Sequence, residues 1–120
     1  MQVLRSTPVM KHLISIDVET DGPIPGPNSM RSLAAVAFDM AGNDIASFCI
    51  NMKPLPGAKP DPETMKWWAK QDPKVRARIG KNPINPKEAI IKFHEWVIQF
   101  PHPRLFAVPA AFDGGFVRHY

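Results

Sequence analysis

Apolar and polar residues alternate along residues 12–19, HLISIDVE. In an extended chain, Ile14, Ile16 and Val18 fall on one side, and the intervening residues, two of them acidic, fall on the other. This pattern predicts a β-strand with one buried face. The segment that follows, residues 22–28 (GPIPGPN), holds three prolines and two glycines, so it predicts a loop.

Two further apolar runs predict a β-hairpin. Residues 32–39, SLAAVAFD, are almost continuously apolar, which is typical of a largely buried strand. Residues 45–53, IASFCINMK, predict a third strand, and residues 41–44 between the two runs form a short polar turn. Strands joined by such a short turn pair with each other as a hairpin.

The middle of the chain carries three helix-start signals, each a capping residue followed by proline. Asp61 begins a first helix, and Asp72 restarts it as a second short turn that Gly80 ends. Asn85 begins the clearest helix, with Glu88 placed for a capping box. One apolar stripe at helical spacing follows in that helix: Ala89, Ile90, Phe93, Trp96, Val97 and Phe100.

The last part of the chain predicts one more strand and one more helix. Residues 104–111, RLFAVPAA, read as a short strand whose end Pro109 makes irregular, and residues 113–120 read as the first turns of a helix. The expected order is therefore β-β-β-α-α-β-α. A meander followed by helix and strand implies an α/β fold, a mixed sheet flanked by helices, in a single domain over residues 1–120.

Composition agrees with one folded domain. Apolar residues make up 44% and charged residues 22% of the 120, and 14 prolines are scattered as loop punctuation rather than gathered into a tract. Cys49 has no partner for an internal disulfide and is expected to be a small buried side chain. We find no secretory signal and no membrane-spanning run, and expect a cytoplasmic protein. The net charge of +4 is only weak support for a polyanionic partner.

The first strand carries an unusual pair of acids. Asp17 and Glu19 share a face and lie about 6.6 Å apart along the backbone. Burying unpaired carboxylates near each other is costly, and a hard divalent cation such as Mg²⁺ or Mn²⁺ would offset the repulsion. Alternatively, both acids are solvated at the open end of the strand, with Asp21 in a turn.

Asp113 strengthens the metal interpretation because it follows another apolar strand, the one predicted over residues 104–111, where a helix begins. Ligands of open α/β sheets gather beyond the strand ends. Two strands that end in acids could therefore supply three carboxylates, from Asp17, Glu19 and Asp113, to one site. Taken alone, Asp113 is equally well explained as a helix N-cap.

Four strings in order resemble a known superfamily: ISIDVETDGP, SLAAVAFD, PETMKWWAKQDPKVRARI and FAVPAAFDGGFVRHY. Over residues 12–120 the chain is similar to the DEDD 3′→5′ exonucleases of the DEDDh type, and more narrowly to the phage-type, exodeoxyribonuclease VIII-like branch. The resemblance implies a ribonuclease H-like fold. It also implies an enzyme that hydrolyses the terminal phosphodiesters of DNA or RNA, with single-stranded 3′ ends as substrate.

The resemblance also assigns roles. Asp17 and Glu19 match the first acidic motif and Asp113 the second, which in the family hold two divalent metals, Mg²⁺ or Mn²⁺. Thr20 falls where the family meets the terminal nucleotide. Met30, at the end of the loop after the first motif, and Phe116 are candidate substrate contacts, with a plain connector and core packing as their respective alternatives.

The chain departs from the family at its C-terminal end. The family's final His-x-x-x-x-Asp motif lies beyond the second motif, whereas this sequence ends seven residues after Asp113, before that motif. We therefore expect a C-terminally incomplete domain, a fragment of the full enzyme. The rival interpretations are a catalytically inactive nucleic-acid-binding or regulatory module of the same fold, and an ordinary domain whose acids lie on the surface. Many relatives are dimers, so a homodimer is also an expected state.

Two features between the motifs have open roles. Trp67 and Trp68 differ by about 100° around a helix, so we expect one in the core and the other half exposed. The alternative is that they stack on nucleic-acid bases. A basic run either forms a solvated face or tracks phosphates near the metal site: Lys66, Lys70, Lys74, Arg76, Arg78 and Lys81.

Overall fold

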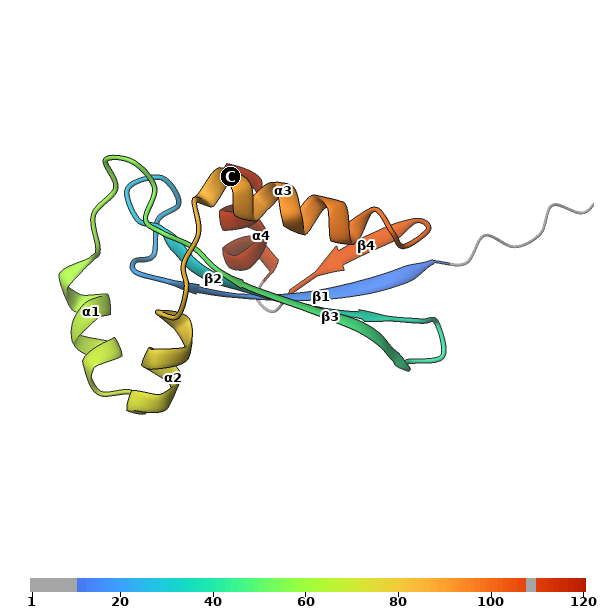
Figure 1. The fold of residues 1–120 in the computed structure, drawn as a ribbon, viewed down its shortest axis with the longest axis horizontal. Helices are drawn as coiled ribbons and strands as arrows, with labels where there is room; N and C mark the ends of the chain where they lie inside the picture. Colours follow the sequence, from blue (N-terminus) through green and yellow to red (C-terminus); the bar gives the residue numbers. More distant parts are fainter. Residues whose placement is uncertain (1–10, 108–109) are drawn as a thin grey trace, which may run out of the picture.

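The structure is a computed structural model that describes residues 11–107 and 110–120. Its centre is a four-stranded sheet with helices on both sides (Figure 1). Helices α3 and α4 cover one face of the sheet, while α1 and α2 stand together at one end of the other face. Most of that second face is left without a helix, and it is the face on which the site is found.

The sheet is mixed, with strand order β3-β2-β1-β4. The central strand β1 (His12–Thr20) pairs antiparallel with β2 (Met30–Phe38) and parallel with β4 (Pro103–Phe106). Strand β3 (Asp44–Asn51) pairs antiparallel with β2, which confirms the predicted hairpin. The predicted mixed α/β sheet is therefore present.

Four helices accompany the sheet. Three of them lie between β3 and β4: α1 (Pro62–Ala69), α2 (Pro73–Ile79) and α3 (Pro86–Val97). The predicted order had only two helices here. The structure has three, because the short turn predicted after Asp72 is a separate helix. The last helix is α4 (Ala110–His119).

The three predicted N-caps are confirmed. Each of Asp61, Asp72 and Asn85 accepts a hydrogen bond from a backbone N–H two or three residues ahead, at 2.9–3.0 Å. A proline follows each cap, where no intrahelical N–H is needed. The capping box at Asn85 is not formed, because Glu88 instead faces Lys92 at 3.7 Å.

The hydrophobic core lies between the sheet and helices α3 and α4. Alternate residues of β1 and their register partners on β2 supply the sheet side, since they point to one face. Phe93 of α3 and Phe116 of α4 close the core from above, and Phe116 is completely buried. The buried apolar residues are Ile14, Ile16, Val18, Met30, Leu33, Ala35, Ala37, Met52, Ala89, Phe93 and Phe116.

The C-terminal elements differ from their predicted bounds. Strand β4 has only four residues, all of them exposed, where eight were predicted. Helix α4 begins at Ala110, so Asp113 lies inside its first turn and is not an N-cap. Pro109, which was predicted to disturb the strand end, lies outside the described residues.

The burial predicted for Cys49 and the core position predicted for one of the two tryptophans are also wrong, whereas the half-exposed position predicted for the other is confirmed by Trp67. Cys49 is exposed rather than buried, because it lies on the face of β3 that no core helix covers. Neither tryptophan of α1 enters the core, since that helix has no buried residue. Trp67 is 54% exposed, and its ring packs edge-on against that of Trp68, with the two ring centroids 4.8 Å apart. Within the described ranges, no helix has the length and apolar character needed to cross a membrane.

Candidate active site

Asp17 and Glu19 lie side by side on the face of the sheet opposite the core. Their register partners on β2 are Ala34 and Ser32, two small residues that leave space on this face of the sheet. Val18 between them points the other way and is buried. The shared face was predicted from the spacing, and the small neighbours add the room that a ligand would need.

A cavity of about 320 Å³ lies over this pair. Strands β1, β2 and β3 form its floor, and helix α2 forms its wall. Ser32 lies on this face of the sheet and lines the cavity, yet it is only 6% exposed. The lining residues are Asp17, Glu19, Ser32, Ala34, Cys49, Val75, Arg78 and Ile79.

Asp113 reaches the same strand from α4. Its Oδ2 accepts a hydrogen bond of 2.9 Å from the backbone N–H of Val18, the residue between Asp17 and Glu19. Strand β4 pairs with β1 only as far as Ser15, so beyond that point the edge of β1 needs another partner. The Asp113 carboxylate, which is 5% exposed, fills this role. The structure thus brings together the three acids that the sequence singled out.

Burial and neighbouring negative charge raise the pKa values of Asp17 and Glu19. Partial burial raises the pKa of Asp17, and the nearby charge of Asp113 raises it further. The pKa of Glu19 is also raised, first by burial and then by the charges of Asp17 and Asp113, while Arg78 opposes the rise. A cluster that resists ionisation in this way is one that a bound cation would stabilise.

The donor chemistry of these residues fits a hard divalent cation, because all three side chains offer carboxylate oxygens. Among the residues that the structure describes, however, no three His, Cys, Asp or Glu side chains are already arranged to hold a metal ion. The three predicted ligands therefore have suitable side chains and lie in the same region of the sheet. They are not already arranged around a common metal position. The assignment of Asp17, Glu19 and Asp113 as metal ligands remains a prediction.

The three residues predicted to contact the substrate, Thr20, Met30 and Phe116, are all buried. Met30 and Phe116 are fully buried in the core, so neither side chain is free to touch a substrate in this structure. For Phe116 the alternative interpretation, core packing, is confirmed. The backbone N–H of Met30 donates to the Tyr120 hydroxyl at 2.6 Å, which ties the start of β2 to the residue that follows α4. Thr20 lines a second cavity of about 160 Å³, although its own side chain is only 8% exposed.

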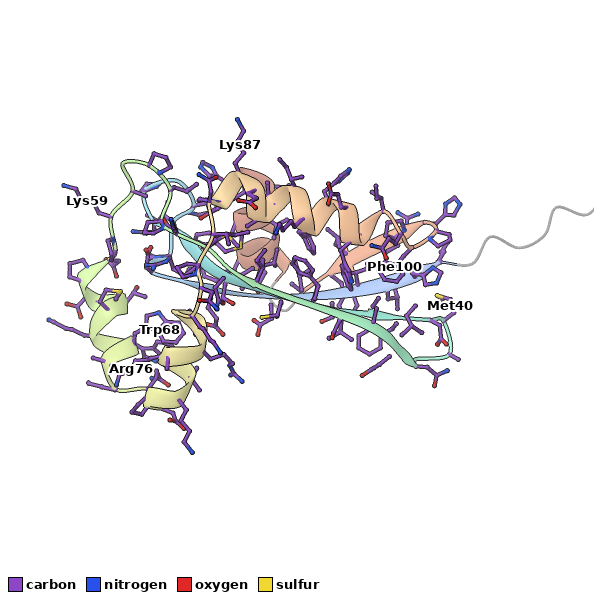
Figure 2. The ribbon with its side chains drawn as sticks, in the orientation of Figure 1. Met40, Lys59, Trp68, Arg76, Lys87 and Phe100 are labelled. Carbon is purple, nitrogen blue, oxygen red and sulfur yellow. The ribbon has the colours of Figure 1, made fainter. Side chains whose placement is uncertain are left out.

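That second cavity lies between the end of β1 and the two helices α1 and α2. Trp68 of α1 and Arg76 of α2 both lie between these two helices (Figure 2). The indole Nε1 of Trp68 donates to the Thr20 carbonyl at 2.8 Å and so ties α1 to the end of β1. The remaining lining residues are Thr20, Asp21, Arg31, Met65, Ile79 and Gly80.

The Trp68 hydrogen bond gives a first testable prediction. Replacing Trp68 with phenylalanine is expected to lower the free energy of unfolding by about 1 kcal/mol, because an aromatic ring is kept and one N–H donor is lost. Urea unfolding followed by circular dichroism measures the change. Trp67→Phe is the matched control and should stay within about 0.5 kcal/mol of the parent, since Trp67 is half exposed. Equal losses in the two variants would contradict the proposed anchor.

The raised pKa values give a second prediction, for the metal-free chain. Stability should fall as the pH rises above the ordinary carboxyl pKa values, 3.8 for Asp17 and 4.5 for Glu19. In that range the folded state still holds protons that the unfolded state has released, so the free energy of unfolding decreases with pH. Denaturation in a chelator should show a shallower slope for an Asp17→Asn, Glu19→Gln double variant. Parallel slopes for the two proteins would contradict the prediction.

Sequence reasoning missed several residues of the site. Ser32 and Val75 reach the cavity only through the strand register and the packing of α2, which no local pattern shows. Arg78 was named in the basic run, but the sequence did not show that it is the member that lines this cavity. Asn51 was missed altogether, although its Nδ2 donates to the backbone carbonyl oxygens of Arg78 and Lys81 at 2.6 and 2.9 Å.

Comparison with solved structures supports the fold. The structure of Escherichia coli Exonuclease I in complex with a dA16 oligonucleotide is similar over 90% of this chain, with a TM-score of 0.70 and 20% identity. An Exonuclease I from Methylocaldum szegediense is similar over 80%, with a TM-score of 0.63 and 22% identity. This chain covers 23% and 20% of those two proteins, respectively.

Comparison of sequences places the chain in a family. It is 31% identical over 112 residues to the 3′-5′ DNA exonuclease Cap18 of Escherichia coli, covering 89% of this chain. The chain spans only 55% of the length of that relative. The model of the family described as the 3′-5′ exoribonuclease Rv2179c-like domain matches residues 12–120, which include all three acids of the site. The chain therefore belongs to the 3′-5′ exoribonuclease Rv2179c-like domain family.

Proposed function

We propose that this chain carries the acidic centre of a 3′→5′ exonuclease that hydrolyses terminal phosphodiesters at single-stranded 3′ ends. One observation carries the proposal: the Asp113 carboxylate is held at the Val18 amide, between Asp17 and Glu19. Membership of the exonuclease family and similarity to Exonuclease I support it. A surface role for these acids does not explain why Asp113, from a distant helix, is buried against this strand.

In this proposal Asp17, Glu19 and Asp113 hold divalent cations, Mg²⁺ or Mn²⁺. When bound, the metal pair supplies an activated water and neutralises the charge that develops on the leaving 3′ oxygen. The residues of the chain set up the binding. Asp17 and Glu19 present their carboxyl groups to the cavity, and the Val18 amide fixes the direction of the Asp113 carboxylate.

Thr20 is proposed to lie beside the terminal nucleotide. It directly follows the acidic pair, and it lines the cavity between β1 and the α1–α2 pair. Since its side chain is mostly buried and its carbonyl already accepts from Trp68, its contribution is mainly to shape that cavity. Base and sugar would then lie on the α1 side of the acids.

The two sequence comparisons name different nucleic acids. The description of the matching family names an exoribonuclease, whereas the relative from Escherichia coli is named as a DNA exonuclease. Both substrates have the same terminal phosphodiester and differ at the 2′-hydroxyl. Parallel assays with 5′-labelled single strands of DNA and of RNA of identical sequence would decide which is preferred.

The test of the proposal is the product pattern. The purified chain with Mn²⁺ or Mg²⁺ is expected to shorten a 5′-labelled single strand stepwise from its 3′ end, and a chelator should abolish the reaction. Strands with a duplexed 3′ end should be shortened more slowly. Intact DNA and RNA strands after prolonged incubation with either metal would refute the proposed activity for this chain.

A second candidate is a non-catalytic nucleic-acid-binding or regulatory module of the same fold. It is favoured by one observation, the lack of a preassembled three-ligand metal site in the described part of the chain. This candidate predicts that the chain binds Mn²⁺ and single strands yet releases no product. The assay above, run beside a binding titration, distinguishes the two.

The narrower expectations belong to the same proposal. Assignment to the phage-type branch, a cytoplasmic location and a homodimer each remain predictions. For the homodimer, Leu105 and Phe106 on β4 are exposed, and in the described chain no strand pairs with the outer edge of β4. Light scattering coupled to size exclusion, at several protein concentrations, would measure the oligomeric state.

A further inference from the structure

Helix α2 brings one positive charge to the acidic cavity. Arg78, in the last turn of that helix, is the basic residue among those that line the cavity with Asp17 and Glu19. Arg78 forms no direct ion pair with Glu19, because the described residues include no N–O contact within 4.0 Å between these two side chains. Arg78 therefore lines the same cavity as the acids without forming an ion pair with them.

The backbone of Arg78 is held in place from the sheet. Asn51, at the end of β3, donates from Nδ2 to the carbonyl oxygen of Arg78 at 2.6 Å and to that of Lys81 at 2.9 Å. The Arg78 carbonyl lies in the last turn of α2 and the Lys81 carbonyl just beyond it, where the regular hydrogen bonds of the helix end. Asn51 thus fixes the end of the helix from which the arginine side chain extends.

The guanidinium itself has unused donors. No hydrogen bond or ion pair within the described ranges engages its nitrogen atoms, and the residue is exposed. An arginine presents five N–H donors in a planar fork that matches two oxygens of a phosphate. A fixed backbone with free donors at the rim of a cavity is suited to receiving an anion.

We propose that Arg78 binds the phosphate of the terminal phosphodiester and that Asn51 positions it. This inference rests on the proposed function and adds a residue to it. A phosphodiester that enters a cavity with two carboxylates is repelled by them, and a cation on the opposite wall offsets that repulsion. Arg78 supplies this cation from the protein itself, from an element that carries none of the three acids.

The charge of the surrounding segment supports the inference. Residues 61–81 contain six basic and three acidic side chains, so this segment supplies +3 of the net charge of +4. Two of those acids, Asp61 and Asp72, are helix caps whose carboxylates already accept backbone N–H groups. The α1–α2 unit therefore presents a positive surface next to the acids, as a polyanionic strand requires.

The test compares Arg78→Ala, Arg78→Lys and Arg104→Ala. Binding of a fluorescent single strand is measured in a chelator, and trimming is measured with Mn²⁺. We expect Arg78→Ala to weaken binding and to lower kcat/KM, each by roughly 10-fold, and to reduce the salt dependence of binding by about one phosphate contact. Lysine should restore part of the loss, since it keeps the charge but not the fork. Arg104, exposed on β4 near the other end of β1, should be silent.

The outcomes separate this inference from the proposed function. If the parent chain trims and Arg78→Ala trims and binds equally well, the role of Arg78 is refuted and the exonuclease proposal stands. If the parent binds without trimming and Arg78→Ala weakens binding, the phosphate contact stands and the exonuclease proposal fails. A parent chain that neither binds nor trims refutes both.

The positioning role of Asn51 is tested by coupling. Asn51→Ala should weaken binding in the parent chain but add little in an Arg78→Ala background, because it acts through that side chain. Thermal unfolding of each variant reports any general loss of folding. Losses that simply add in the double variant would show that Asn51 does not act through Arg78.

Discussion

Replacing Asp17 with asparagine is expected to lower the rate of 3′ trimming by roughly 100-fold or more, while the chain stays folded. Asparagine has the same shape as aspartate and lacks its charge. Asp17 is on the exposed face of β1, so no core contact is lost. Any loss of activity therefore reports the charge, which a bound cation needs and which the packing of the sheet does not.

Metal binding should change in parallel with the rate. Isothermal titration with Mn²⁺ is expected to show weaker binding for Asp17→Asn and for Glu19→Gln than for the parent chain. Asp44→Asn is the matched control, because Asp44 is an exposed acid at the hairpin end of β3. If Asp17→Asn bound Mn²⁺ and trimmed as the parent does, the acids would be ordinary surface residues and the proposed function would fall.

Removal of the Asp113 side chain is expected to affect both folding and activity. Asp113→Ala leaves the buried N–H of Val18 without its acceptor, which costs about 1–3 kcal/mol of unfolding free energy. It also removes one of the three carboxylates, so trimming should fall as far as it does in Asp17→Asn. Urea unfolding and the trimming assay measure the two effects separately.

Asp113→Asn separates the two roles of that side chain. The amide oxygen of asparagine can still accept the Val18 N–H, so most of the stability should return. The negative charge is not restored, so metal binding and trimming should stay low. A fully active Asp113→Asn variant would show that Asp113 serves only to complete the edge of β1.

Local sequence patterns determined most of the elements. The alternation along β1 placed Asp17 and Glu19 on one face, and the three Asx-Pro pairs marked the starts of α1, α2 and α3. These predictions succeed because side-chain direction and helix capping depend on neighbours within a few residues. The same rules failed at the end of β4, where the strand is short, exposed and held only by β1.

Burial could not be read from residue type at three positions. Cys49 is exposed although cysteine is a typical core residue, whereas Met30 and Phe116 are buried although both were also candidate substrate contacts. Each depends on which face of the sheet a helix covers. That is decided by the whole sequence of connections, since α3 and α4 cover one face and α2 covers only part of the other (Figure 1).

The sequence by itself determined the identity of the three acids and the strand that carries two of them. Only the tertiary structure decided that Asp113 meets that strand between them, and that Asn51 holds Arg78 beside the cavity. The physical reason is distance along the chain. Asp113 and Val18 are 95 residues apart and Asn51 and Arg78 are 27 apart, so their contacts exist only once the sheet has paired and the helices have packed on it.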